Sequence, residues 1–398
     1  MTQSEALDSI LAQLEKLRDP AGFFNAGIPN FDHLFGRDSA VAALQVLHRE
    51  PDVARATLLT LAKFQGTKQR LRREEYVGKI LHEHYPYGLP DMLHALIHHD
   101  DRFHLLLNLI LWRFPYYGSV DAGAWYLILL HHYYRKTGDA ALVKHLWPSV
   151  RGVLHWYDHH ATHRITGLVT FRSHFSFGLK IQSWKDGMKS NIVPPVAIVE
   201  VQGYYYYALE LLAELAHEVM DDRVEAAALR TRADTLKSHF QSAFAPVAGT
   251  IPMAIDGDGH PYVSVASNPG HLLFTGIMNK HQRDTIVKQL FGPNMITPFG
   301  VRTEATTEPT FDPISYQNGS VWPFDNWVIH QGLKKHGYKE EAEHIKTGLV
   351  KVFGYWNILP ELYAVDTHGK LAPIERACRI QAWSAGALVN LLEDAPAI

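Results

Sequence analysis

Apolar residues recur at three- and four-residue spacings along most of the chain, the pattern of amphipathic helices. The first 20 residues predict a helix, and a hairpin follows over 39–50 and 51–66, with Asp38 or Ser39 placed to cap its first helix. Further helices are expected at 101–114, 122–138, 139–160, 197–219, 222–244, 281–291, 319–337, 338–356 and 379–394. Strand signals are short, at 167–171 and 250–255.

Successive helices joined by short turns pack antiparallel, so these helices predict a closed ring of hairpins with a funnel at one end. No repeat, low-complexity tract or linker divides the chain, and we expect residues 1–398 to form one all-α domain. The turns between the helices combine aromatic residues with Asp, Glu, Arg or Asn beside Gly or Pro. Because loops on a rigid scaffold usually carry function, the site is expected in these turns.

Composition narrows the class of protein. Hydrophobic residues make up 46% of the chain and charged residues 20%, and the net charge of -3 offers no broad field for nucleic acid or a membrane. No apolar run approaches the roughly 20 residues that span a bilayer. A single cysteine, Cys378, excludes an intramolecular disulfide, and the N-terminus lacks a charged-then-apolar leader, so a cytoplasmic location is expected.

The 25 histidines include clusters such as HEHY and HHDDRFH, but none has HExxH or Cys/His spacing, so we predict no metal site. The chain has no Walker A motif, no GxGxxG after a strand and no GxSxG elbow, and no cofactor is expected. Of the catalytic chemistries considered, catalysis by carboxylates is the one that remains.

Glycoside hydrolysis needs one protonated carboxyl and one ionised carboxylate across the scissile bond. Asp186, in the segment SWKDG, is the candidate acid, because Trp184 beside it would remove water and raise its pKa. Lys185 would act in the opposite direction if its side chain turned the same way. The alternative is that Asp186 only caps a helix or lies in a polar turn.

Glu361 is the candidate for the second carboxyl, since it stands between Pro360 and Leu362 where an acid is otherwise out of place. It could equally pair with a structural arginine. Glu375 competes for the same role, and Glu83 and Glu200 are weaker candidates.

Arg37 and Asp38 lie side by side in a turn and could together bind the vicinal hydroxyls of a sugar, the guanidinium donating and the carboxylate accepting. An N-cap with an incidental arginine is the alternative. Residues in similar turns are Asp32, Asp121, Trp322 and Asp325.

Seven segments in order, AGIPNFDHLFGRDSAVAALQVL, GKILHE, YYGSVDA, SWKDG, YQNGSVWPFDN, PELY and QAWSAGA, resemble the bacterial amylo-α-1,6-glucosidases and glycogen-debranching-type glycosidases. They are similar, more distantly, to glucoamylases and processing-glucosidase-like enzymes. The resemblance spans about Gly27 to Leu392 and implies an (α/α)6 toroid and an inverting mechanism on α-linked glucosyl residues.

The resemblance also implies residue roles. It makes Asp186 the general acid and Glu361 the general base, and it assigns Arg37 and Asp38 to the far hydroxyls of the terminal glucose. It places further residues around the same subsite: Phe31, Asp32, Trp184, Trp322 and Asp325, with Glu83, Tyr117 and Gln202 as additional lining candidates.

Two departures bear on the substrate. Many debranching-type relatives carry a β-rich domain before the toroid, whereas here GRD lies within the first forty residues, and ERACRIQAW differs from the relatives' segment. A smaller α-glucoside or oligosaccharide is therefore plausible beside an α-glucan. Two other functions stay open: a sugar epimerase or isomerase on the same toroid, which would exchange a proton through histidines, and a non-catalytic carbohydrate-binding protein.

Overall fold

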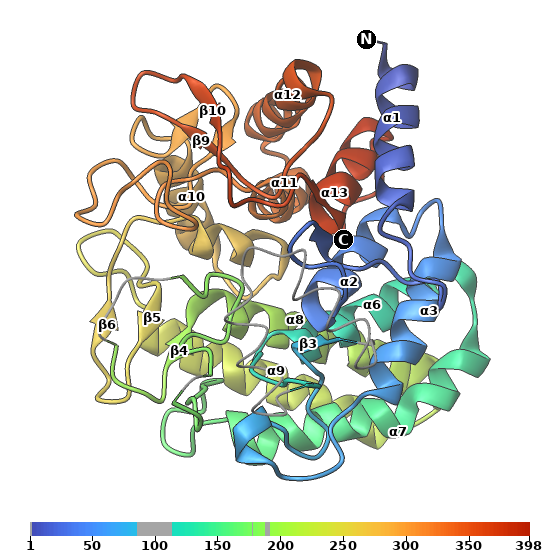
Figure 1. The fold of residues 1–398 in the computed structure, drawn as a ribbon. Helices are drawn as coiled ribbons and strands as arrows, with labels where there is room; N and C mark the ends of the chain where they lie inside the picture. The colour runs from blue at the N-terminus through green and yellow to red at the C-terminus, as the bar shows by residue number, and fades with distance from the viewer. Residues whose placement is uncertain (1, 86–113, 177, 188–191) are drawn as a thin grey trace.

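The computed structural model describes residues 2–85, 114–176, 178–187 and 192–398, which fold mostly into helices (Figure 1). The α-helices are α1 (Gln3–Glu15), α2 (Gly36–Val46), α3 (Pro51–Lys63), α6 (Ala122–Thr137), α7 (Ala140–Trp156), α8 (Val199–Glu218), α9 (Arg223–Ala243), α10 (Lys280–Leu290), α11 (Pro323–His336), α12 (Lys339–Trp356) and α13 (Ala382–Leu392). Two 3-10 helices, η1 (Leu71–Arg73) and η3 (Asn268–Phe274), and a π-helical turn, η2 (Tyr157–Ala161), complete them.

Six of these elements form a closed inner ring. Contacts run from α2 to α6, α8, η3, α11 and α13, and then from α13 back to α2. The inner elements pack against the outer helices α3, α7, α9, α10, α12 and α1, respectively, and α6 also packs against α3. The outer helices surround the inner ones in Figure 1. The predicted all-α toroid of six pairs, (α/α)6, is confirmed.

The sixth pair differs from the other five, because it joins the two ends of the chain. The first helix, α1, lies against α13 and takes the outer position of this pair. The Gln13 side chain strengthens this seam by donating a 2.9 Å hydrogen bond to the Asn357 carbonyl after α12. The predicted N-terminal helix therefore closes the ring instead of only preceding it.

The strands are short and connect the loops at the helix ends. Antiparallel pairs join β1 (Gly27–Ile28) to β11 (Ile380–Gln381), β2 (Leu34–Phe35) to β3 (Glu83–His84), β7 (Ile296–Thr297) to β8 (Gly300–Val301) and β9 (Tyr363–Val365) to β10 (Leu371–Pro373). A further antiparallel set runs β4 (Ala197–Ile198), β5 (Ala254–Ile255), β6 (Pro261–Tyr262). β2, β4 and β11 each lead directly into an inner helix, so they hold the entrance of α2, α8 and α13 in place.

Two glycines permit the close packing of the inner ring. A Cβ on Gly36 would lie 2.1 Å from the Leu81 carbonyl oxygen, and one on Gly332 of α11 would lie 2.2 Å from the Leu273 Cβ of η3. Since no side chain fits at these distances, the first turn of α2 and the α11–η3 contact both depend on glycine.

The predicted helices agree with the structure in type, with three differences. α2 begins at Gly36, so Arg37 and Asp38 lie in its first turn and neither Asp38 nor Ser39 is its N-cap. The segment 167–171 makes single bridges instead of a strand, because Val169 and Phe171 pair with different partners. The predicted helix at 101–114 lies, apart from its last residue, outside the described residues.

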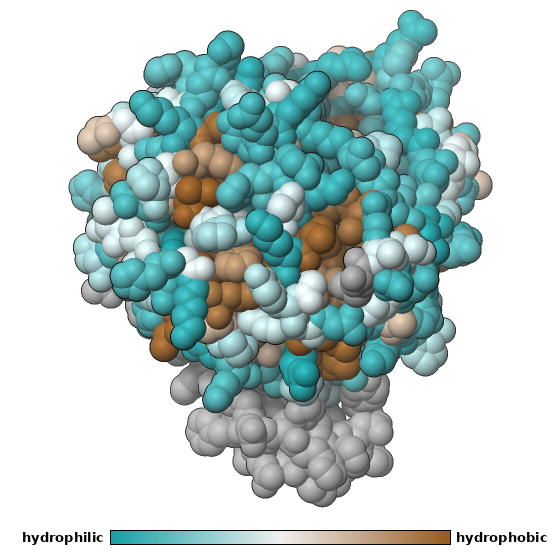
Figure 2. Space-filling view, turned by 90° about the horizontal axis from the view of Figure 1, so that it is seen from above, coloured by the Kyte–Doolittle hydropathy of each residue, from teal (hydrophilic) through white to brown (hydrophobic). Residues whose placement is uncertain are grey.

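The face seen in Figure 2 is mainly hydrophilic, and its hydrophobic side chains form separate patches between polar ones. Large apolar side chains that are exposed on the described surface, such as Ile165 and Val224, come from different elements. None of the described helices combines the length and the apolar character that crossing a membrane requires.

Candidate active site

A cavity of about 200 Å³ opens where the inner helices begin. Its size suits a single sugar ring better than a drug-sized ligand. Its walls combine carboxyl groups, one arginine and several aromatic rings, which is the composition expected of a carbohydrate site. The lining residues are Phe31, Phe35, Arg37, Asp38, His82, Glu83, Leu179, Trp184, Asp186, Tyr316, Gln317, Trp322, Glu361 and Trp383.

The beginnings of four inner helices carry buried acids. Asp38, Glu200 and Asp325 lie in the first turns of α2, α8 and α11, and Asp121 is the residue before α6. All four are at most 5% exposed. Helix N-termini favour negative charge, which offsets part of the cost of burying these groups.

The segment that carries Asp186 is held from two sides. The Gln317 side chain donates a 2.7 Å hydrogen bond to the Trp184 carbonyl and accepts one of 2.5 Å from the Gly187 N–H. Lys185 turns away from the cavity and donates to the Thr303 carbonyl at 2.9 Å. The side chains of Trp184 and Asp186 therefore face the cavity while the lysine between them anchors the segment in the core.

Burial raises the pKa of Asp186 to about 6, and the nearby Arg37 guanidinium limits the increase. Trp184, which is 1% exposed, is part of the wall that keeps water away from this carboxyl. The expected desolvation is thus present, and Lys185 does not oppose it because its ammonium points elsewhere. A carboxyl with a pKa near 6 can hold a proton at near-neutral pH and deliver it to a leaving group.

Glu361 lies in the same cavity and is 1% exposed. Its carboxyl accepts one hydrogen bond from the Tyr316 hydroxyl and another, of 2.9 Å, from the Cys378 N–H. Burial raises the pKa of Glu361 to about 7, although both hydrogen bonds act to lower it. The charges of Asp38 and Asp186 add to the increase.

The pKa of Glu361 exceeds that of Asp186, although a general base is expected to be the stronger acid of a pair. The hydrogen bonds argue for the assignment nonetheless. Two fixed donors on Glu361 suit an ionised acceptor, which is the state a base needs. These directional contacts favour Glu361 as the ionised member of the pair.

Arg37 is the only arginine or lysine among the residues that line the described cavity. Its Nε lies 3.2 Å from Asp38 and its Nη1 lies 3.3 Å from Asp121, which also accepts a 2.6 Å hydrogen bond from Ser119. Burial raises the pKa of Asp38 to about 6, against the effect of Arg37. The pair is held rigidly, with the Arg37 guanidinium 5.3 Å from the Trp383 ring, and can meet two adjacent hydroxyls.

The structure brings eight of the twelve predicted site residues to the cavity: Phe31, Arg37, Asp38, Glu83, Trp184, Asp186, Trp322 and Glu361. The other four lie elsewhere. Asp32 is exposed and accepts from Asn25, and Tyr117 donates to the Phe64 carbonyl. Gln202 pairs through its amide with the backbone of Val169, and Asp325 is bonded to His271 outside the cavity lining.

Six lining residues were absent from the prediction: Phe35, His82, Leu179, Tyr316, Gln317 and Trp383. All of them except Leu179 stand within motifs that carried the resemblance, so their positions were the available signal. Leu179 has no distinguishing local pattern. Glu375, the competitor of Glu361, is exposed and does not line the cavity.

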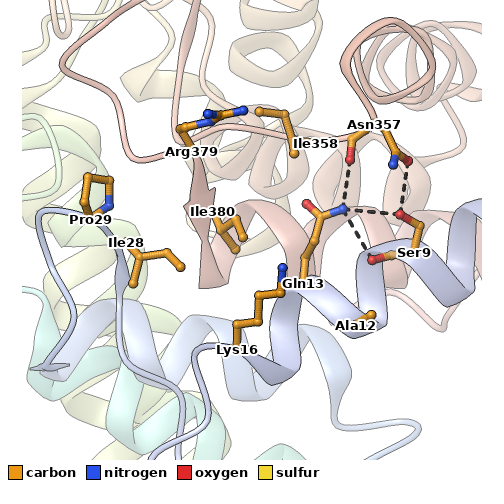
Figure 3. A pocket seen from close by; sticks show the side chains of 10 residues that line it. All are labelled: Ser9, Ala12, Gln13, Lys16, Ile28, Pro29, Asn357, Ile358, Arg379 and Ile380. Atoms are coloured by element: carbon orange, nitrogen blue, oxygen red, sulfur yellow. Dashed lines mark hydrogen bonds between the residues drawn. The ribbon is translucent and has the colours of Figure 1, made fainter.

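A larger groove of about 620 Å³ lies between α1 and the segments 357–358 and 379–380 (Figure 3). Lys16 and Arg379 approach it from opposite walls, beside Gln13 and the apolar residues Ala12, Ile28, Pro29, Ile358 and Ile380. Its lining contains neither a carboxyl group nor an aromatic ring. Since acid/base hydrolysis needs both carboxyls, the smaller cavity is the candidate active site.

Among the described residues, the acids and histidines close enough to share a metal ion are Asp256, Asp258 and His260. They belong to the turn between β5 and β6, and none of them lines the cavity. The carboxyl chemistry of the cavity needs no contribution from this turn.

A helical toroid with two carboxyl groups in one aromatic-lined cavity has the features of a glycoside hydrolase. A family model agrees: residues 33–357 match the "Mannosylglycerate hydrolase MGH1-like glycoside hydrolase domain", and the chain belongs to this family. The predicted glycoside hydrolase is thereby confirmed, within the MGH1-like family.

Individual relatives are more distant. Mannosylglycerate hydrolase MGH1 from Selaginella moellendorffii is 27% identical over 86 residues, which are 21% of this chain and only 18% of that protein. The GH63 mannosylglycerate hydrolase from Thermus thermophilus, solved in complex with glucose, superposes with a TM-score of 0.74 at 16% identity, covering 97% of this chain and 99% of that one. A rhamnosidase from Klebsiella oxytoca with rhamnose bound gives 0.62 at 15% identity, over 98% of this chain and 64% of that one. At these identities the structural likeness concerns the fold.

Proposed function

We propose that this chain is an inverting, exo-acting α-glycosidase that removes one terminal hexose from a small α-glycoside. The observation that carries the proposal is the cavity itself, which both Asp186 and Glu361 line. Two fixed hydrogen-bond donors hold Glu361 as an acceptor, and Asp186 has a raised pKa that suits a proton donor.

In the proposed reaction the Asp186 carboxyl donates its proton to the glycosidic oxygen as the bond to the anomeric carbon breaks. Glu361 removes a proton from a water that attacks the same carbon from the opposite face. The products are a free hexose of inverted configuration and the alcohol. Arg37 and Asp38 hold the hydroxyls far from the reacting carbon, and the Trp184, Trp322 and Trp383 rings enclose the sugar.

We propose a hexosyl glycerate, with mannose or glucose as the hexose, as the first substrate to test. The family's description and the names of its relatives support an acidic aglycone. The protein adds an exposed cation beside the lining residue Tyr316, since the Arg376 guanidinium lies 5.4 Å from the Tyr316 ring. A neutral α-glucoside, such as isomaltose, remains the alternative from the resemblance to debranching glucosidases.

The isomerase alternative has less support. His82 is the one imidazole among the residues that line the described cavity, and proton exchange across a sugar would call for a second acid/base group of this kind. The two carboxyls would have no role in it.

The experiment is proton NMR of the anomeric region during the first minutes of reaction. The panel comprises α-mannosyl glycerate, α-glucosyl glycerate, isomaltose and maltose. We expect release of the β-hexose from one of the glycerates and no turnover by Asp186→Asn. Initial release of the α-hexose would instead require a covalent intermediate, and retained substrate mass with altered configuration would identify an isomerase.

A further inference from the structure

Behind the Trp184 wall of the cavity lies a histidine fixed between two inner helices. His271 of η3 is fully buried, and its Nε2 lies 2.7 Å from Oδ1 of Asp325 at the start of α11. Its Nδ1 is hydrogen-bonded to the Tyr204 hydroxyl of α8. Three of the six inner-ring elements thus meet at one imidazole.

The two partners determine the tautomer of this imidazole. A carboxylate can only accept, so Nε2 carries the hydrogen that faces Asp325. In the neutral ring Nδ1 then accepts from the Tyr204 hydroxyl, and the ring cannot rotate without losing both hydrogen bonds. A buried aspartate that orients a histidine in this way is a known device for holding an imidazole in one position.

One face of this imidazole supports Trp184. The two rings are stacked, with centroids 5.3 Å apart and planes inclined by 16°. The indole Nε1 of Trp184 has no hydrogen-bond partner among the described residues. Trp322 and Phe324 touch the same indole edge-on, at 5.9 and 5.7 Å. The plane of Trp184 is therefore set by packing alone, and His271 is its stacked neighbour.

We infer that His271, fixed by Tyr204 and Asp325, is a positioning residue for the catalytic acid: it sets the plane of Trp184 and, through the adjoining backbone, the direction of the Asp186 carboxyl. This inference rests on the proposed function. The backbone of the segment is already tied by Gln317 and Lys185. The stacked imidazole supplies the remaining restraint, the one on the side chains that face the sugar.

Leaving-group dependence separates this role from a purely structural one. A misdirected acid slows substrates whose leaving group needs a proton, whereas an α-hexosyl fluoride loses fluoride with little assistance. The variants are His271→Gln and Tyr204→Phe, the second of which removes a single hydroxyl and keeps the ring. Tyr126→Phe, on α6, is the matched control, because it removes another buried hydroxyl, one that bonds to Ser149 outside the cavity lining.

For both variants we expect kcat on the hexosyl glycerate to fall about tenfold, with KM within about twofold. This loss is part of the roughly 10²–10⁴-fold that general acid catalysis contributes in all. The rate on the fluoride should stay within about twofold of the unchanged protein. The control should behave as the unchanged protein. Equal losses on both substrates, or a raised KM with unchanged kcat, would overturn the inference.

Asp186→Asn, measured in parallel, tests the assignment of the general acid separately from the positioning role of His271. If Asp186→Asn slows the hexosyl glycerate but keeps the rate on the fluoride, Asp186 is the acid. If the His271 and Tyr204 variants then fail to keep the rate on the fluoride, only the positioning role is rejected. If Asp186→Asn loses both substrates equally, the assignment of the acid in the proposed function is itself wrong.

Discussion

Glu361 and Cys378 are joined by two reciprocal hydrogen bonds. The Glu361 N–H donates to the Cys378 carbonyl at 2.9 Å, and the Cys378 N–H donates to Oε2 of Glu361 at the same distance. The backbone of residue 378 therefore positions both the main chain and the carboxylate of the proposed base. The thiol takes no part in this contact, and burial raises its pKa far above the ordinary value.

Replacing Glu361 by Gln should reduce kcat by about 10²–10⁴-fold, the usual contribution of one acid/base group. The fold should persist, because glutamine keeps the volume and an acceptor for Tyr316. The matched control is Glu375→Gln, on an exposed glutamate that should leave activity within about twofold. Steady-state kinetics on the best substrate compare the two. A loss with Glu375→Gln and none with Glu361→Gln would exchange their roles.

The pH profile of kcat/KM should be a narrow bell. Catalysis needs one carboxyl protonated and the other ionised, and burial raises the pKa of Asp186 to about 6 and that of Glu361 to about 7. Below this window both carboxyls are protonated and the base is lost. Above it both are ionised and the acid is lost. A rate that stays flat from about pH 5 to 8 would contradict the assignment of these two groups.

Tyr316→Phe should lower kcat/KM on the acidic side of that bell and move its upper apparent pKa, which belongs to Glu361, to higher pH. The hydroxyl stabilises the ionised form of Glu361, so its removal raises the pKa of this carboxyl further. We expect kcat/KM near pH 6 to fall about tenfold, because hydrogen bonds to charged groups are worth about 1.5–3 kcal/mol. Tyr338→Phe is the control, because it removes a hydroxyl that bonds to Asp284 between α10 and α12. It should leave both apparent pKa values of the profile unchanged. A moved lower apparent pKa with an unchanged upper one would indicate that Tyr316 acts on Asp186 instead.

Glu200→Gln should stabilise the protein at high pH only. Burial raises the pKa of Glu200 from 4.5 to about 8, so the folded state binds the proton more tightly than the unfolded state. Wild-type stability then falls as pH rises from about 4.5 to about 8, and the neutral amide escapes this loss. Urea unfolding should show a gain on the order of 3 kcal/mol at about pH 8 and almost none near about pH 4.5.

The control for this experiment is again Glu375→Gln, which removes an exposed carboxyl and should change stability little at either pH. A gain from Glu200→Gln that is equal at both pH values would mean that its cause is packing and not ionisation.

Two glycine substitutions should change stability in opposite directions. Gly332→Ala places a Cβ against Leu273 and should destabilise by about 1–3 kcal/mol or more, because α11 and η3 must separate. Gly354→Ala, in α12, meets nothing within 4 Å and should stabilise by about 0.5–1 kcal/mol through helix propensity. Thermal unfolding of the two variants compares them directly. If both substitutions stabilised the protein, the contact between α11 and η3 would be looser than the structure shows.

Much of the fold was predictable, because helical periodicity is a local property of the chain. The ranges around α3, α10 and α12 agree with the structure to within a few residues. η3 was not predicted, since its seven residues are too short for a periodic signal and it forms where α8 and α11 pack against it. The closing pair of α1 and α13 was equally hidden, because no local pattern relates the two ends of a chain.

For the site, residue types and motifs were enough to predict carboxyl chemistry: carboxyls stand beside aromatic residues in turns, and the motifs point to Asp186 and Glu361. The direction of each side chain became visible only in the folded chain. There Lys185 turns into the core, Glu361 and not Glu375 reaches the cavity, and Asp325 bonds to His271 instead of lining the sugar site. Residue type and spacing are local properties, whereas the direction of a side chain depends on contacts with residues far away in the chain.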